Sequence, residues 1–165
     1  MKKNILGAAV IAFALSLFAS SCGDSKEKTV VEYLTDAKNG WVLESATSSP
    51  AYVMKDGTNV TDLITGGYLK ECELDDIIKF TKNGGLTVSP GKLICNKETE
   101  YASTWTYNEE TKVLRFQIPF FYDNELENAV VTKCTEKQFR VNYTYNDVEN
   151  PAKKVYTFTL TYKRK

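Results

Sequence analysis

Apolar and polar side chains alternate with a period of two along the second half of this 165-residue chain. Successive side chains of a β-strand point to opposite faces, so this period is typical of strands. Three segments show it, with apolar faces made by Leu114, Phe116, Ile118 and Phe120, by Phe139, Val141, Tyr143 and Tyr145, and by Tyr156, Phe158, Leu160 and Tyr162. Polar residues such as Arg115, Asn142 and Thr157 take the opposite faces. The pattern predicts antiparallel strands with one aromatic face buried and one face in water.

Turn residues divide the chain into eight or nine predicted strands. The expected strands are 41–45, 51–54, 76–81, 86–89, 101–107, 112–121, 126–134, 138–145 and 153–162. Asn83-Gly84 predicts a tight hairpin between two of them, because both central residues of such a turn adopt positive φ. Residues 47–50 are expected to form a loop, and 61–73 to be irregular with one helical turn. The near-regular spacing indicates an antiparallel meander, as a barrel or a sandwich.

A closed barrel removes the exposed strand edges that an open sheet of this size would have. Eight strands close around an interior that side chains can fill, or that can hold one small ligand. A short helix is expected before the first strand, with Thr29 as its N-cap, with Val30, Val31 and Leu34 on one side, and with Gly40 at its end. We therefore expect an all-β, antiparallel, up-and-down eight-stranded barrel with a short N-terminal helix.

The first 22 residues differ from everything that follows. Lys2 and Lys3 precede a mostly apolar run from Ile5 to Phe18, and small residues stand just before Cys22. A basic start, an apolar core shorter than a membrane span and small residues at a cleavage site are typical of a secretory signal. We therefore assign residues 1–21 to a signal peptide and expect export.

The run Ala19-Ser20-Ser21-Cys22 resembles the lipobox of bacterial lipoproteins. The resemblance implies cleavage before Cys22 and attachment of acyl chains, palmitate among them, to its sulfur and new amino group; the alternative is an ordinary secretory signal cut elsewhere. Two acyl chains are enough for stable membrane anchoring. Because Gly23 stands where an inner-membrane retention signal has Asp, an outer-membrane location facing the periplasm or the cell surface is favoured. The expected organisation is a signal peptide at 1–21, a lipidated tether at 22–28 and one domain at 29–165.

Size and charge limit the function further. Removal of the signal peptide leaves 144 residues with 19 basic and 21 acidic side chains, a formal net charge of −2. That length suits one domain with a full hydrophobic core. A chain without excess positive charge lacks the electrostatic footprint of nucleic-acid binding, so no nucleic-acid partner is expected.

Three cysteines follow the lipobox, at positions 72, 95 and 134. An exported chain can form a disulfide, and three cysteines leave one unpaired. Cys72 and Cys95 flank a compact hairpin region, so we pair them, and such a bridge contributes roughly 3 kcal/mol in the chain-entropy model. Cys134 lies where its strand needs an apolar side chain and is expected to be a buried free thiol. Scattered cysteines without histidine lack metal-ligand spacing, so neither a metal nor another cofactor is expected.

The order of several short motifs resembles the small lipocalin-like lipoproteins of Gram-negative gut anaerobes. The motifs are the lipobox, Gly40-Trp41, Cys72-x-x-Asp75-Asp76, the run 78–84, Cys95 and Ser103-Thr104-Trp105. The resemblance covers about residues 30–162 and implies an eight-stranded up-and-down barrel with a Cys72–Cys95 bridge. The late-strand arginine that lipocalins pack over the first-strand tryptophan has only Arg164 as its match. The family supplies no ligand, since most of its members have no assigned function.

Residues suited to catalysis are scarce. The sequence contains no histidine, which removes the usual general base and the usual activation of a serine or cysteine nucleophile. Asp75-Asp76 is the densest acidic pair, but adjacent strand residues point to opposite faces and do not form a working carboxylate pair. The pair is expected to position the turn before a strand. An enzyme is therefore not expected.

The aromatic strand faces are the one candidate binding site. Apolar walls with a few phenol hydroxyls suit a small apolar or amphipathic ligand. The candidate lining residues are Trp105, Tyr107, Phe116, Phe139, Tyr143, Tyr156 and Phe158. The alternative role of the same residues is a packed core without a cavity, which is the usual role of aromatic residues at strand spacing.

Phe120, Phe121 and Tyr122 end a strand before a polar loop. Three consecutive aromatic side chains cannot all point inward, so at least one is expected at the surface, as a pocket rim, a docking patch or a cover of the barrel end. Two functions follow. The first is a membrane-anchored lipoprotein that binds a small ligand in its barrel without catalysis. The second is an interaction module with a filled interior, which docks an envelope protein partner through this loop.

Overall fold

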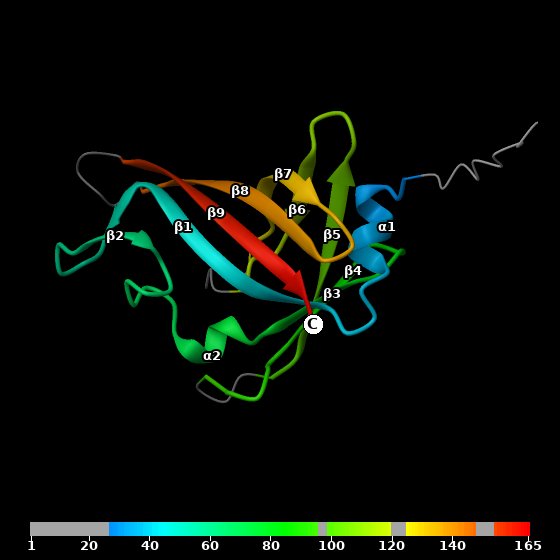
Figure 1. Cartoon of the computed structure of the whole chain (residues 1–165), viewed down its shortest axis with the longest axis horizontal. Helices are drawn as coiled ribbons and strands as arrows, with labels where there is room; N and C mark the ends of the chain where they lie inside the picture. Colours follow the sequence, from blue (N-terminus) through cyan, green and yellow to red (C-terminus); the bar gives the residue numbers. More distant parts are fainter. Residues whose placement is uncertain (1–26, 96–98, 120–124, 148–153) are drawn as a thin grey trace, which may run out of the picture.

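The computed structural model describes residues 27–95, 99–119, 125–147 and 154–165 (Figure 1). They form an all-β domain with two short helices, α1 (Val30–Thr35) and α2 (Glu71–Leu74). The strands are β1 (Trp41–Val53), β2 (Asn59–Asp62), β3 (Ile77–Phe80), β4 (Gly85–Ser89), β5 (Tyr101–Asn108), β6 (Val113–Phe116), β7 (Glu127–Cys134), β8 (Gln138–Asn146) and β9 (Val155–Arg164).

Eight of the nine described strands close into an antiparallel barrel. From β3 to β9 each strand pairs with the next along the chain, and β1 pairs with both β3 and β9. The β1–β9 pairing runs from Trp41 opposite Arg164 to Ser49 opposite Thr157, whereas β1 meets β3 at Trp41 opposite Ile78. Farther along β1, beyond its short pairing with β3, the same edge of β1 pairs with β2. The predicted eight-stranded barrel is confirmed, because the β1–β9 pairing closes the sheet on itself.

The loop expected at 47–50 is wrong, because β1 continues through it. Residues Thr47 to Ser49 pair with β9, and without this pairing their backbone groups would lack partners. Pro50 has no N–H to donate, and it lies where the pairing of β1 with β2 shifts register, between Thr47 and Tyr52. In this stretch of the strand Thr47, Ser49 and Pro50 are exposed. Ser48 is buried, and its hydroxyl donates to Pro50 O at 2.7 Å.

The β3–β4 hairpin forms where Asn83-Gly84 predicts it, with residues 81–84 between the two strands. Thr81 N donates to Gly85 O at 2.9 Å, and Gly84 N donates to Thr81 O at 3.0 Å. Within the described turn 81–85, Gly84 alone adopts a positive φ, of 82°. The expected positive φ at both central residues is therefore confirmed for Gly84 and wrong for Asn83. Trp105 Nε1 also donates to Thr81 O, at 3.0 Å, and thereby ties the turn to β5.

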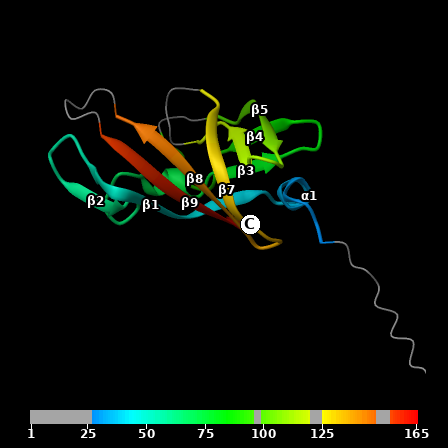
Figure 2. The ribbon, with the colours of Figure 1, turned by 90° about the horizontal axis from the view of Figure 1, so that it is seen from above.

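Inward-facing aromatic rings fill the described interior in two clusters. The cluster near α1 contains Trp41, Phe80, Trp105, Phe116, Phe139 and Tyr162, and the cluster near β2 contains Tyr52, Tyr68, Tyr143, Tyr145, Tyr156 and Phe158. Figures 1 and 2 place α1 at one end of the molecule and β2 at the other, so we call these the α1 end and the β2 end. Burial of one such side chain contributes roughly 1.5–3 kcal/mol, so these two clusters together contribute a large part of the stability of the fold.

The short helix α1 packs against β3 and β7, beside the first residues of β1. Glu32 N donates to Thr29 Oγ1 at 3.2 Å, and Thr29 N donates to a Glu32 carboxylate oxygen at 2.7 Å, which is a capping box. Leu34 is the buried side chain of α1, and its backbone carbonyl accepts a hydrogen bond from Trp41 Nε1 at 3.0 Å. The helix is therefore fixed to the barrel.

Candidate ligand-binding site

A pocket of about 560 Å³ opens at the β2 end of the barrel. Its lining residues are Tyr52, Met54, Lys55, Asp56 and Tyr68. The first four come from the end of β1 and the turn into β2, and Tyr68 comes from the segment between β2 and α2. The volume lies in the range of small-molecule sites, and most of the lining side chains are aromatic or apolar.

Packed aromatic rings stand behind this pocket. Tyr52 contacts Tyr68 and Tyr156 edge-on, with ring centroids 5.0 Å apart in each pair. One layer deeper, Phe158 stacks with Tyr145 at 5.8 Å and with Tyr156 at 6.3 Å. Edge-to-face and stacked rings each add about 0.5–1.5 kcal/mol beyond their burial. The pocket wall is therefore preorganised, which lowers the entropy lost when a ligand binds.

The polar groups in and behind the pocket differ in charge and in whether they have a hydrogen-bond partner. Burial raises the pKa of the Tyr68 phenol, so its hydroxyl stays protonated. The Tyr156 hydroxyl is buried and has no hydrogen-bond partner within the described residues. Asp56 Oδ1 accepts from Thr58 N at 2.9 Å, and this bond holds the pKa of the Asp56 carboxyl below its usual range. Lys55 makes no ion pair with any described residue, so the rim carries its ammonium group beside the hydrogen-bonded Asp56 carboxylate.

Four of the seven residues expected to line a ligand site lie away from this pocket. Trp105, Phe116 and Phe139 surround Phe80 at the α1 end, with centroid distances of 5.3, 6.0 and 5.9 Å. These three rings pack against Phe80 in the hydrophobic core, so they do not line the pocket. Tyr107 is half-buried at the edge of the same core.

The other three, Tyr143, Tyr156 and Phe158, belong to the cluster behind the pocket. Phe158 lies 5.8 Å from Tyr52, and Tyr143 lies 6.2 Å from Phe158. The structure thus brings part of the predicted set to the pocket, as its second layer. The sequence did not identify Tyr52 and Tyr68 as lining residues, because Tyr52 follows the misassigned loop and Tyr68 lies in a segment without a period.

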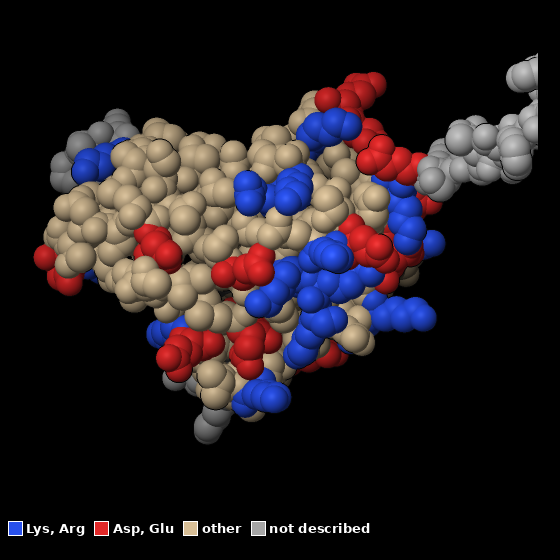
Figure 3. Space-filling view, in the orientation of Figure 1, with Lys and Arg blue, Asp and Glu red and all other residues tan. Residues whose placement is uncertain are grey.

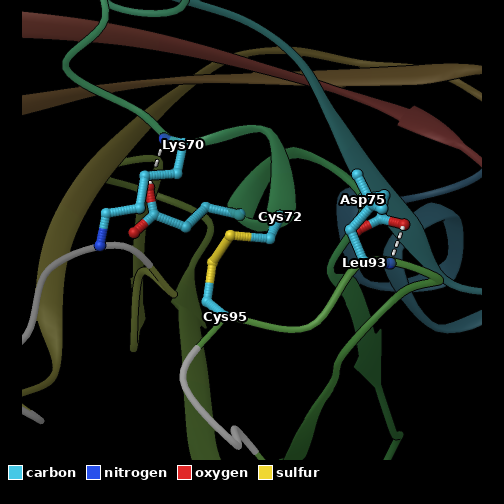
Figure 4. The surroundings of a disulfide bond; sticks show 6 residues. Lys70, Cys72, Asp75, Leu93 and Cys95 are labelled. Atoms are coloured by element: carbon cyan, nitrogen blue, oxygen red, sulfur yellow. Dashed lines mark hydrogen bonds between the residues drawn. A yellow bond between two sulfur atoms is a disulfide. The ribbon is translucent and has the colours of Figure 1, made fainter.

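The predicted disulfide is present, between Cys72 in α2 and Cys95 (Figure 4). Their Cα atoms are 5.5 Å apart, a usual separation for a bridge. Asp75 holds the same loop from the other side, since its Oδ2 accepts from Lys92 N at 2.6 Å and from Leu93 N at 3.2 Å. Asp75 therefore positions the loop after β4, rather than the turn before β3 that was expected.

This doubly held loop displays two apolar side chains. Leu93 is 49% exposed and Ile94 is 62% exposed. The loop approaches Asp75 so closely that a Cβ on Gly91 would lie 2.2 Å from the Asp75 carboxyl carbon. The aromatic run 120–122, which was expected to be a docking patch, lies outside the described residues.

Cys134 is a free thiol, as predicted, but it is half-buried rather than buried. It ends β7 at the edge of the core, so one side of its side chain is left uncovered. Desolvation raises the pKa of the Cys134 thiol to about 12. The nucleophilic thiolate is therefore almost absent at neutral pH.

Alkylation of Cys134 should consequently be slow in the folded protein. At pH 8 we expect iodoacetamide to modify the native thiol at least about a hundredfold more slowly than the same thiol in denaturant, where the pKa returns to about 8.5. Mass spectrometry of the chain from Gly23 to Lys165, with its disulfide intact, measures both rates. Equal rates would contradict the burial of this side chain.

Within the described ranges, no three or more Cys, Asp or Glu side chains gather in a way that could hold a metal ion. The described helices are all too short or too polar to cross a membrane. No protein-family model matches this sequence, and a search of the curated proteins found no significant match.

Proposed function

We propose that this protein is a membrane-anchored lipoprotein that binds a small apolar or amphipathic ligand at the β2 end of its barrel, without catalysis. The observation that carries the proposal is the pocket of about 560 Å³ against Tyr52, Met54 and Tyr68. Its rings offer an apolar surface, and Lys55 at the rim offers a charge for a polar group. An amphipathic molecule matches both features.

The anchor in this proposal is the lipidated Cys22. Because Gly23 follows it in place of a retention signal, the anchor lies in the outer membrane, and the domain faces the periplasm or the cell surface. The lipobox supports it, together with the short distance in sequence between Cys22 and Val30, where α1 begins. The pocket lies at the β2 end, away from α1 (Figure 1). An anchor next to α1 therefore leaves the pocket open to the aqueous compartment.

A contact at the α1 end supports the resemblance to lipocalin-like lipoproteins. The Arg164 guanidinium carbon lies 5.5 Å from the centre of the Trp41 ring, in a cation–π arrangement. Arg164 is the residue that the sequence offered as the match to the late-strand arginine of lipocalins. The pocket lies at the other end of the barrel, so this contact leaves it free.

Filling the pocket tests ligand binding directly. In the Met54→Trp variant the larger indole should occupy the space against Tyr52 and weaken binding of the fluorescent probe anilinonaphthalene sulfonate by about tenfold. Fluorescence titration of the chain from Gly23 to Lys165 measures the dissociation constant. Val130→Trp is the matched control, since Val130 is 44% exposed on β7 and lies outside the pocket lining. Equal weakening in both variants, or none in either, would refute the pocket as the site.

The exposed Leu93 and Ile94 favour a second candidate function, docking of an envelope protein partner. Asp75 and the disulfide hold these side chains in place, which reduces the entropy lost on association. Native mass spectrometry of protein taken from its own envelope separates the two functions. A small-molecule adduct supports the pocket, and a complex with a second protein supports docking.

A further inference from the structure

Positive charge is left uncompensated at the α1 end of the barrel. Three acidic side chains there already have cationic partners, since Asp36 lies 2.9 Å from Lys28, Glu136 lies 3.7 Å from Arg164 and Glu44 lies 4.0 Å from Lys163. Glu32 is used by the cap of α1. Five further lysines have no ion-pair partner among the described residues, and we call them the basic face: Lys38, Lys79, Lys82, Lys137 and Lys165.

The five lysines lie together around the start of β1. Lys165 N donates to Gly40 O at 3.0 Å, and the Lys79 side chain lies against Gly40. Lys38 lines the same surface hollow as Arg164. The backbone N–H of Arg164 donates to the backbone O of Lys137 at 3.0 Å. Lys82 is close enough to Asp36 to lower the pKa of that carboxyl. Figure 3 shows this gathering of Lys and Arg around the C-terminal end of β9.

The chain also enters the domain beside this face. Glu27, the first described residue, stands just before α1, and Cys22 precedes it by five residues. Five residues span at most about 18 Å when fully extended. An anchor at Cys22 therefore keeps Glu27 within about two Debye lengths of the membrane, since the Debye length is about 8 Å at physiological ionic strength. Lys28, next to Glu27, lines the same surface hollow as Lys38.

We infer that the basic face docks on anionic phospholipid headgroups and thereby orients the barrel on its membrane. The inference rests on the proposed lipid anchor for the placement of the domain. The attraction itself depends on the five lysines, against which stand Glu27, Glu32 and the terminal carboxylate. Polybasic clusters of this size next to a membrane anchor bind anionic lipid surfaces. β1 has 13 residues and spans about 40 Å, so the docked orientation points the pocket at its far end into water.

Charge reversal on the unanchored domain tests the inference independently of lipidation. The chain from Gly23 to Lys165 contains α1 and every strand of the barrel, so it folds without the signal peptide. It should sediment with vesicles of equimolar phosphatidylglycerol and phosphatidylethanolamine, less so as salt is raised, and not with phosphatidylcholine vesicles. The double variant Lys137→Glu/Lys165→Glu should lower this binding by about tenfold or more.

Lys92→Glu/Lys154→Glu is the matched control, because both residues are exposed, lie outside the basic face and carry the same change in net charge. It should change binding by less than about threefold. Equal losses in the two double variants, or equal binding to both kinds of vesicle, would overturn the inference. Thermal unfolding of both variants shows whether they fold.

A second measurement needs no variant. Acetylation of the unaltered chain should be slowed by phosphatidylglycerol vesicles at Lys38, Lys137 and Lys165 but not at Lys92 and Lys154, and uniform labelling would overturn the inference. Failure of these tests leaves the anchor at Cys22 and the pocket intact, since cell fractionation and the probe titration test those separately.

Discussion

Replacement of Cys22 by Ser should move the protein from the membrane fraction to the soluble fraction while leaving its domain folded. Without the thiol no thioether-linked acyl chain forms, and anchoring by two or more chains is lost. The barrel is unaffected, because all its strands lie between Trp41 and Arg164. Cell fractionation, together with incorporation of labelled palmitate, measures the effect.

Cys134→Ser is the matched control for this experiment. It removes a cysteine that is half-buried in β7 and should leave both the label and the membrane association unchanged. A Cys22→Ser protein that still sediments with membranes, or that still takes up palmitate, would refute the lipoprotein assignment. Loss of palmitate label in both variants would refute it as well.

Phe139→Ala should cost about 3–5 kcal/mol in the free energy of unfolding. The Phe139 ring is fully buried, stacks on Tyr162 at 4.6 Å and meets Trp41 edge-on at 5.0 Å. Its removal leaves a cavity between strands that the closed barrel prevents from collapsing. Because small domains have only about 5–15 kcal/mol of stability, the loss is a large share of the total.

Denaturant unfolding of the chain from Gly23 to Lys165 measures this loss, with Val130→Ala as the control. Val130 is 44% exposed, and its truncation should cost less than about 0.5 kcal/mol. A cost below about 1.5 kcal/mol for Phe139→Ala would mean that the ring borders a void. The α1 end would then be the place for a ligand, as expected from a cavity lined by Trp105, Phe116 and Phe139, and the pocket at Tyr52 and Tyr68 would not be the site.

The period of two predicted two of the three long alternating segments accurately, whereas the strand expected at 112–121 is wrong in length, because β6 ends at Phe116. The segments 138–145 and 153–162 correspond to β8 and β9, which the structure places side by side with their aromatic residues on the buried face. The pairing of Cys72 with Cys95 was also predicted, because both cysteines flank one hairpin. These features depend on neighbours in sequence, or on one face of one strand.

The errors fall where distant parts of the chain decide the outcome. Thr47 to Ser49 form a strand because β9 lies beside them, more than a hundred residues later in the sequence. Of the two central turn residues, Gly84 adopts a positive φ and Asn83 does not, and the side chain of Trp105 from the next strand is bonded to this turn. Local composition carries no information about either contact.

The sequence by itself determined the fold class, the buried faces of β8 and β9 and the disulfide, since periodicity and spacing are properties of the chain alone. Only the tertiary structure decided where a ligand could bind and where charge would accumulate. The pocket needs Tyr52 beside Tyr68, and the basic face needs Lys38, Lys137 and Lys165 at one end of the barrel. Closure of the sheet between β1 and β9 creates both ends, and this pairing joins segments that local patterns cannot relate.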